Sequence, residues 1–384
     1  MPCLHDEAPA KTRMTLSLEQ MVQSYDSGKS LDQALTLPAC WYRDPRMLEL
    51  EYGTAFSQTW QAIARSDQLR HIGHYITSEL ANEPVVAVRG SDGILRAFYN
   101  VCRHHGAAVM TKPEGRAEKL RCPYHGWTYD LQGALVFAPE FGGVNDFDRF
   151  ANSLVPIEIA VYKNWVFAKL DQGNPSLQDF FGKDLLDHFE ALNLEQLNWL
   201  ERRSYTLNCN WKVFVDNYLD GGYHVPHLHR GLNSVLDYGN YTIATGERFC
   251  LQSSPIVSTV GDGKTREVRK GTPAFYYWIY PNFMINLYAG VMDTNLVIPR
   301  GVDRTEVIFD YYFADISDRE KQQNLASIAL SEQIQAEDVA ICESVQRGLA
   351  SRSYLAGRLS VRREAGEHLF HKLLYADLKA GLSG

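Results

Sequence analysis

The spacing of apolar residues divides the chain into an alternating region and a region of mixed periodicity. From about Gly73, apolar residues recur at every second position, as expected of half-buried β-strands. Two pairs of alternating segments flank short glycine-bearing turns, which predicts hairpins. These hairpins pair 84–89 with 94–100 and 126–131 with 134–137. Residues of roughly 40–165 are therefore predicted to form a small, mostly β unit.

The rest of the chain mixes helical and alternating segments. Segment 305–314 alternates from Val307 to Phe313, as a half-buried strand should. The other strands predicted here are 202–209, 246–253, 274–288 and 291–298. The predicted helices of the whole chain are 15–35, 44–59, 176–193, 211–224 and 317–350. An antiparallel sheet with helices packed against it follows from this order, so the predicted fold class is α+β.

A polar joint rich in turn-forming residues, at 171–175, separates the two regions. The sequence predicts three units. A helical N-terminal segment, 1–39, packs on the larger domain. A β-rich domain spans 40–170, and a helix-covered antiparallel-sheet domain spans 171–384.

Composition excludes several classes of partner. The chain has 38 Lys and Arg against 46 Asp and Glu, a net charge of −8, which argues against a nucleic-acid partner. No apolar stretch is long enough to cross a membrane, and the N-terminus lacks a secretion signal. Seven scattered cysteines do not predict a disulfide framework. We expect a soluble cytoplasmic protein, or one of the plastid stroma if a transit peptide preceded this sequence.

Two Cys–His pairs lie on separate loops of the β unit. Cys102-Arg103-His104 is followed, after seventeen residues, by Cys122-Pro123-Tyr124-His125. Zinc fingers usually place both Cys in one pair and both His in the other, whereas a Rieske [2Fe–2S] cluster needs two thiolates on one iron and two imidazoles on the other. Pairs that each contain one Cys and one His meet the requirement of the Rieske cluster directly. A structural zinc site and ordinary core residues are the alternatives.

A second group of polar residues lies on the predicted helix 211–224. Asn217, Asp220 and His224 fall on one face of an otherwise apolar helix, and His229 follows Pro226, where the chain can turn back. Polar groups on a buried face need partners. Two histidines and one carboxylate form the facial triad of oxygen-activating Fe(II) enzymes.

The third ligand is predicted on the helix 317–350. Asp338 lies on an apolar stripe with Ile334, Ile341 and Val345, where a carboxylate is out of place unless a cation meets it. A salt bridge with Arg347 is the alternative. The neighbouring Glu337 is expected to point elsewhere, into solvent.

These motifs resemble those of Rieske non-haem iron oxygenase alpha subunits, closest to the choline monooxygenase and glycine betaine monooxygenase group. The first pairs, followed by Gly126-Trp127, resemble the Rieske motif. The phrase DNYLDGGYHVPHLH, residues 216–229, is similar to choline monooxygenases, as are segments 275–288, 291–299 and 337–349. Many relatives place a bridging carboxylate three residues before the first His, where this chain has Gly221. We expect a helix bulge at Gly221-Gly222 to bring Asp220 into that role.

The resemblance implies two cofactors and a role for each residue. Cys102, His104, Cys122 and His125 would hold the [2Fe–2S] cluster, and His224, His229 and Asp338 the mononuclear Fe(II). Asp220 would pass electrons from the partner subunit's His125 within a homotrimer, with Asn217 also in the catalytic group. The chain has no Gly-x-Gly-x-x-Gly motif opening a βαβ unit, so a separate reductase or ferredoxin is expected to supply the electrons.

The resemblance also implies a monooxygenase that hydroxylates a C–H bond of a choline-like methylated ammonium compound, by oxidation or N-demethylation. Aromatic faces attract such cations. Candidate pocket residues are Tyr276, Tyr277, Trp278, Tyr280, Phe283 and Tyr288. Two alternatives stay open: an aromatic or natural-product substrate on the same metal centres, and a non-enzymatic Rieske electron carrier.

Overall fold

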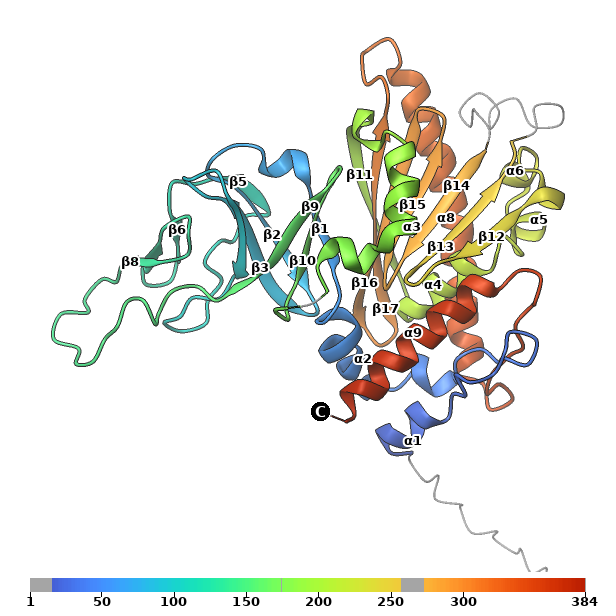
Figure 1. Ribbon diagram of the computed structural model, residues 1–384, viewed down its shortest axis with the longest axis horizontal. Helices are drawn as coiled ribbons and strands as arrows, with labels where there is room; N and C mark the ends of the chain where they lie inside the picture. The colour runs from blue at the N-terminus through green and yellow to red at the C-terminus, as the bar shows by residue number, and fades with distance from the viewer. Residues whose placement is uncertain (1–15, 174, 257–272, 384) are drawn as a thin grey trace, which may run out of the picture.

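The computed structural model describes residues 16–173, 175–256 and 273–383 (Figure 1). A β-rich part lies at one end of the molecule and a larger sheet with its helices at the other. Both parts contain antiparallel sheets, and helices cover the larger one, which confirms the predicted α+β class.

The β-rich part consists of a seven-stranded sheet and a small three-stranded sheet. The larger one has the order β1-β10-β9-β4-β3-β2-β5. Its strands are β1 (Gln61–Arg65), β2 (His74–Leu80), β3 (Glu83–Arg89), β4 (Leu95–Tyr99), β5 (Glu114–Arg116), β9 (Pro156–Tyr162) and β10 (Trp165–Lys169). The smaller one contains β6 (Leu120–Arg121), β7 (Thr128–Tyr129) and β8 (Leu135–Phe137) and lies toward the outer end of this part (Figure 1). Both predicted hairpins are confirmed, as β3–β4 and β7–β8.

The larger part is built on a seven-stranded antiparallel sheet of order β11-β17-β16-β15-β14-β13-β12. Its strands are β11 (Asn198–Leu207), β12 (Thr242–Thr245), β13 (Phe249–Ser254), β14 (Ala274–Ile279), β15 (Phe283–Tyr288), β16 (Val291–Gly301) and β17 (Arg304–Phe313). The segment predicted as one strand, 274–288, is two strands, because the chain turns at Pro281, whose ring nitrogen cannot donate to a sheet.

Helices cover both faces of this sheet. The helix α3 (Leu177–Ala191) lies on one face, while α4 (Trp211–Leu219), α8 (Lys321–Leu349) and α9 (Ala365–Gly381) lie on the other (Figure 1). Two helix predictions fail in detail, and one helix was missed. The helix predicted over 15–35 is only α1 (Leu18–Gln23), because the polar turn residues from Ser24 to Ser30 end it. The helix at 44–59 is α2 (Pro45–Glu51) followed by a π-helical turn, η2 (Tyr52–Phe56). The helix α9 was not predicted.

The segment from Ala39 to Phe56 packs with the larger part. Its apolar side chains belong to the same core cluster as those of α4 and α9. Lys212 Nζ on α4 lies 2.6 Å from Glu51 Oε1 on α2, and both side chains are fully buried. The predicted domain boundaries stay predictions, and this packing favours moving the first one toward Gln61.

Candidate metal centres and active site

The turn after α4 sets the positions of the first histidines. Asn210 caps the start of the helix by accepting a hydrogen bond from the Lys212 backbone. The helix ends at Leu219, because Gly221 and Gly222 both have φ +68° and a side chain at Gly221 would overlap the Arg363 carbonyl. The predicted continuation to residue 224 with a bulge is therefore wrong: the chain reverses instead.

This reversal brings three predicted ligands together. His224 precedes the short helix α5 (Val225–Leu228), His229 follows it, and Asp338 comes from α8. Asp338 Oδ1 lies 3.1 Å from His229 Nε2 and 4.0 Å from His224 Nε2. One ligand atom from each residue lies within 4.8 Å of the others. The three residues can therefore share one metal ion.

A carboxylate lies behind each imidazole. Asp220 Oδ2 is 2.6 Å from His224 Nδ1, and Glu337 Oε2 is 2.6 Å from His229 Nδ1. Donation of each Nδ1 proton to its carboxylate leaves both Nε2 lone pairs for a metal, the arrangement usual for metal-bound histidines. The donor set therefore fits a mononuclear iron. Asp220 meets His224 across the glycine turn rather than along one helix face.

The environment of His229 also favours a cation. Burial by itself would lower the pKa of this imidazole. The hydrogen bonds and negative charges of Asp338 and Glu337 outweigh burial and raise the pKa of His229 above its ordinary value. The same two negative charges would also stabilise a bound metal cation.

The prediction that Glu337 points away from the site is wrong, although 31% of its side chain is exposed. Glu337 and Asp338 lie on adjacent helix positions, and His229 lies between their carboxylates. Because neighbouring helix positions differ by about 100° in direction, two consecutive acids can flank one side chain. No signal in the sequence identified Glu337 except its place beside Asp338.

The buried stripe of α8 also differs from its prediction by one position. Ile341 and Val345 are exposed, whereas Gln335, Cys342 and Leu349 are buried. Asp338 still lies on the buried side, between Gln335 and Cys342 in helical spacing. Asn217 Nδ2 donates to Asp338 Oδ1 at 2.9 Å. No ion pair joins Asp338 to Arg347, and both residues lie in the described part of the chain, so the alternative salt bridge is excluded.

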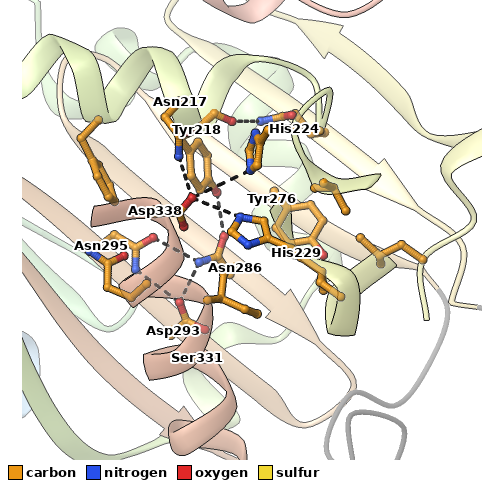
Figure 2. Close-up of a pocket in the computed structure, with 18 of the residues that line it drawn as sticks. Asn217, Tyr218, His224, His229, Tyr276, Asn286, Asp293, Asn295, Ser331 and Asp338 are labelled. Atoms are coloured by element: carbon orange, nitrogen blue, oxygen red, sulfur yellow. Dashed lines mark hydrogen bonds and ion pairs between the residues drawn. The ribbon is translucent and has the colours of Figure 1, made fainter. Parts of the chain in front are cut away.

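The three residues lie in the wall of a cavity between the sheet and helices α4 and α8 (Figure 2). Its volume is about 790 Å³ including its mouth. Of the six aromatic candidates, Tyr276 and Tyr288 line the cavity, with their hydroxyls 3.0 Å apart. Tyr277, Trp278, Tyr280 and Phe283 belong to the main core instead. The strand positions of these residues could not be assigned to a face from the sequence.

The two Cys–His loops in the β-rich part have the same construction. The backbone N–H of Gly106 donates to Cys102 and that of Gly126 to Cys122, at 3.0 and 3.1 Å. Both glycines have positive φ, +76° and +75°, which favours Gly. Each loop thus presents one buried thiol and one outer imidazole, two residues after the Cys in the first loop and three after it in the second.

The two imidazoles lie close together, and so do the two thiols, as the two ends of a cluster require. His104 Nδ1 and His125 Nδ1 lie 3.1 Å apart, close to the roughly 3.4 Å expected between two ligands of one tetrahedral metal. The His104 ring stacks on Trp127, and the His125 ring on Tyr124. Burial and the neighbouring Cys102 raise the pKa of Cys122, so its thiolate needs positive charge nearby. The donor set fits a [2Fe–2S] cluster. His105, beside it, is exposed.

A β-rich unit with paired Cys–His loops and a second domain with a two-histidine, one-carboxylate triad define a Rieske-type oxygenase subunit. Family comparison agrees. Residues 59–148 match the Rieske [2Fe-2S] domain, and residues 194–379 match the catalytic domain of ring-hydroxylating alpha subunits. Because a catalytic domain is present, the chain is not an electron carrier alone.

Known proteins are similar over almost the whole chain. Choline monooxygenase of Arabidopsis thaliana, a chloroplastic protein, is 38% identical, over 97% of this chain and 89% of its own length. The carnitine monooxygenase oxygenase subunit of Escherichia coli is 32% identical, over 89% and 93%. The solved structure of a quaternary ammonium Rieske monooxygenase aligns with a TM-score of 0.82 at 28% identity, over 91% of this chain and 96% of that one. The chain belongs to the Rieske non-haem iron monooxygenase family.

Membership in this family confirms the predictions about the cofactors and the electron donor. The two matched domains hold a [2Fe–2S] cluster and a mononuclear non-haem iron. The chain is an oxygenase subunit that takes its electrons from a separate donor and acts on a small molecule. Among the described residues, no helix is both long and apolar enough to span a bilayer.

Replacing Glu337 by Gln is expected to weaken iron binding at the triad. An amide cannot hold the His229 Nδ1 proton as a carboxylate does, and loss of such a partner usually costs about 10–100-fold in metal affinity or activity. The measurement is iron retained per chain after dialysis against graded chelator. Glu332→Gln, on the same helix and 3.5 Å from Arg203, is the matched control. Equal iron retention in both variants would refute the assigned role.

Proposed function

We propose that this chain uses O₂ and externally supplied electrons to hydroxylate a C–H bond of a quaternary or otherwise methylated ammonium compound, with choline as the first candidate. The observation that carries this proposal is the cavity itself. It places a triad fit for iron beside tyrosine side chains and a second carboxylate, Asp293, which together suit a cation. The relatives support the same class, since they act on choline and carnitine.

The proposed ligands follow from the geometry above. His224, His229 and Asp338 hold the mononuclear iron. The cluster ligands are Cys102, Cys122, His104 and His125. When bound, the cluster supplies single electrons and the mononuclear iron supplies a place where O₂ becomes reactive toward a C–H bond. The overall reaction consumes one O₂, two electrons and two protons, and yields one hydroxylated product and one water.

The residues of the chain then have distinct tasks. Asp220 and Glu337 fix the tautomers of His224 and His229 by accepting their Nδ1 protons. Asn217 orients Asp338 by donating to its Oδ1 atom. The walls of the cavity, including Tyr276 and Tyr288, exclude bulk water and hold the substrate against the triad.

Electron delivery is proposed to occur between subunits of a homotrimer. The Cys–His loops lie in the β-rich part and the triad in the larger part, at opposite ends of the folded subunit (Figure 1). An electron that stayed within one subunit would have to cross the length of the molecule. A head-to-tail ring places the tip of one subunit beside the triad of the next. Asp220, hydrogen-bonded to His224, would then also accept a hydrogen bond from the ring N–H of His125 of the partner subunit. The aligned relative was studied for inter-subunit electron transfer.

A product screen tests this function. The purified chain, supplied with a generic reductase, NADH and O₂, is expected to convert choline to the aldehyde hydrate or to a demethylated amine and formaldehyde. Omission of the reductase is expected to stop turnover, because the electrons come from a separate donor. Conversion of aromatic acids but of no methylammonium compound would contradict the proposed substrate class. The cytoplasmic or plastid location stays a prediction from the sequence.

A further inference from the structure

One amide in the wall of the cavity has no hydrogen-bond partner for its nitrogen. Gln335 on α8 is 2% exposed and lines the same cavity as the triad. None of the described residues accepts a hydrogen bond from Gln335 Nε2. A buried N–H group that binds nothing is unfavourable. The natural partner of this group is therefore an acceptor atom that enters the cavity.

The other amides of the same wall are already engaged. Four of them line the cavity: Asn217, Gln252, Asn286 and Asn295. The side-chain nitrogen of each donates to another group of the protein, at 2.7 to 3.3 Å. Figure 2 shows three of these bonds, from Asn217, Asn286 and Asn295. Of the amides in the described part of this wall, Gln335 is thus the one whose nitrogen has no acceptor.

The helix places this amide beside the proposed iron ligand. Gln335 precedes Asp338 by three residues on α8, and residues at this spacing project from the same face, with Cβ atoms about 5–6 Å apart. Tyr276 and Tyr288 belong instead to β14 and β15 of the sheet. A ligand that reaches from the sheet to α8 would meet aromatic side chains at one end and the amide, close to the triad, at the other.

Choline has an acceptor atom at the end that such an amide would bind. Two carbons separate its trimethylammonium group, which aromatic faces attract, from its hydroxyl oxygen. The hydroxyl oxygen is bonded to the carbon whose oxidation gives the aldehyde hydrate. If Gln335 binds this oxygen, that carbon is held near Asp338 and the N-methyl groups lie toward the sheet.

The orientation of the substrate decides between two reactions with the same requirements. Each consumes one O₂, two electrons and two protons, breaks one C–H bond, forms one C–O bond and releases one water. Hydroxylation of the carbon that bears the hydroxyl gives the aldehyde hydrate. Hydroxylation of an N-methyl carbon gives a hydroxymethyl compound, whose C–N bond then breaks to release formaldehyde, a proton and a tertiary amine.

We propose that Gln335 binds the hydroxyl oxygen of a choline-like substrate through its side-chain N–H group and so directs oxidation to the carbon that bears this hydroxyl. This inference rests on the proposed function and deepens it, because the proposed function does not choose between the two carbons. Gln335 is a specificity-determining residue, which selects hydroxylated ammonium compounds over purely alkyl ones.

A matched pair of cations tests the hydrogen bond. Choline and ethyltrimethylammonium carry the same charge and differ only in the hydroxyl oxygen, so the ratio of their Kd values isolates the contribution of that oxygen. Calorimetry without oxygen measures both Kd values on the metal-loaded wild type and on Gln335→Met, whose side chain has a similar length and no N–H group. We expect the wild type to bind choline at least tenfold more tightly, about 1.4 kcal/mol, and the variant to bind both within about threefold.

Two binding results would overturn the inference. One is equal Kd values for the two cations in the wild type, a result that does not depend on the folding of any variant. The other is an unchanged Kd ratio in Gln335→Met. Gln322→Met, at an exposed position of the same helix, is the matched control and is expected to keep the wild-type ratio.

Product analysis tests the direction of oxidation. With a reductase, NADH and O₂, the wild type is expected to convert choline mainly to the aldehyde hydrate, and Gln335→Met to raise the share of formaldehyde at least about fivefold. A wild type that releases mainly formaldehyde from choline would contradict the inference. If the wild type binds no methylammonium compound, the proposed function fails as well. If the wild type oxidises choline but Gln335→Met keeps both the Kd ratio and the products, the inference alone fails.

Discussion

Replacement of Asp338 by Ala is expected to lower product formation by more than about 100-fold, which corresponds to about 2.7 kcal/mol or more. Asp338 is the only carboxylate whose oxygen lies within 4.0 Å of the Nε2 atoms of both His224 and His229 among the described residues. Its removal leaves two neutral imidazoles, too few ligands and too little negative charge to retain Fe(II).

Metal analysis distinguishes this effect from general misfolding. The Asp338→Ala variant is expected to lose one iron of three per chain and to keep the visible spectrum of the [2Fe–2S] cluster. The cluster ligands lie in the other part of the molecule, so the substitution does not touch them. Full activity with two irons per chain would exclude the triad as the oxygen site.

Replacement of Asp220 by Asn is expected to lower steady-state turnover about 100-fold even when excess Fe(II) in the assay keeps both metal centres loaded. Asp220 accepts hydrogen bonds from the backbone N–H groups of Tyr223 and His224 and from the His224 ring. The amide keeps the size of the side chain but not the negative charge that would join His224 to His125 of the partner subunit. Loss of the hydrogen-bond partner of a metal-bound histidine usually lowers metal affinity or activity about 10–100-fold. Slower electron transfer would lower turnover further.

The rate of cluster oxidation identifies the step that Asp220 serves. In stopped-flow, a reduced Asp220→Asn protein mixed with O₂ and choline is expected to oxidise its cluster far more slowly than the wild type. Asp187→Asn is the control for the change in net charge. Normal cluster oxidation together with low turnover would place Asp220 in another step.

The proposed ligands that lie in short motifs could be predicted from the sequence alone. Cys102, His104, Cys122 and His125 could be proposed because two mixed pairs at this spacing favour a Rieske cluster. His224 and His229 could be found because a proline turn separates two histidines on an otherwise apolar segment. The structure brings each of these groups together.

Contacts between side chains that are far apart in the sequence could not be predicted in the same way. Glu337 contacts His229 only because α8 packs beside the residue that follows α5, and the sequence does not encode that placement. The stripe of α8 was predicted one position out of phase, since its buried positions include Ser331 and Gln335, which face the cavity rather than an apolar core. Asp293 was missed because a carboxylate in an apolar strand becomes informative only when its cross-strand partners are known.

A single-turnover measurement tests the central claim most directly. The purified chain is loaded with iron, reduced without oxygen, freed of reductant and then mixed with O₂ and choline in the absence of any reductase. We expect cluster oxidation together with formation of up to one hydroxylated or demethylated product per mononuclear iron. Oxidation of the cluster with no product from choline or any other methylammonium compound would contradict the account.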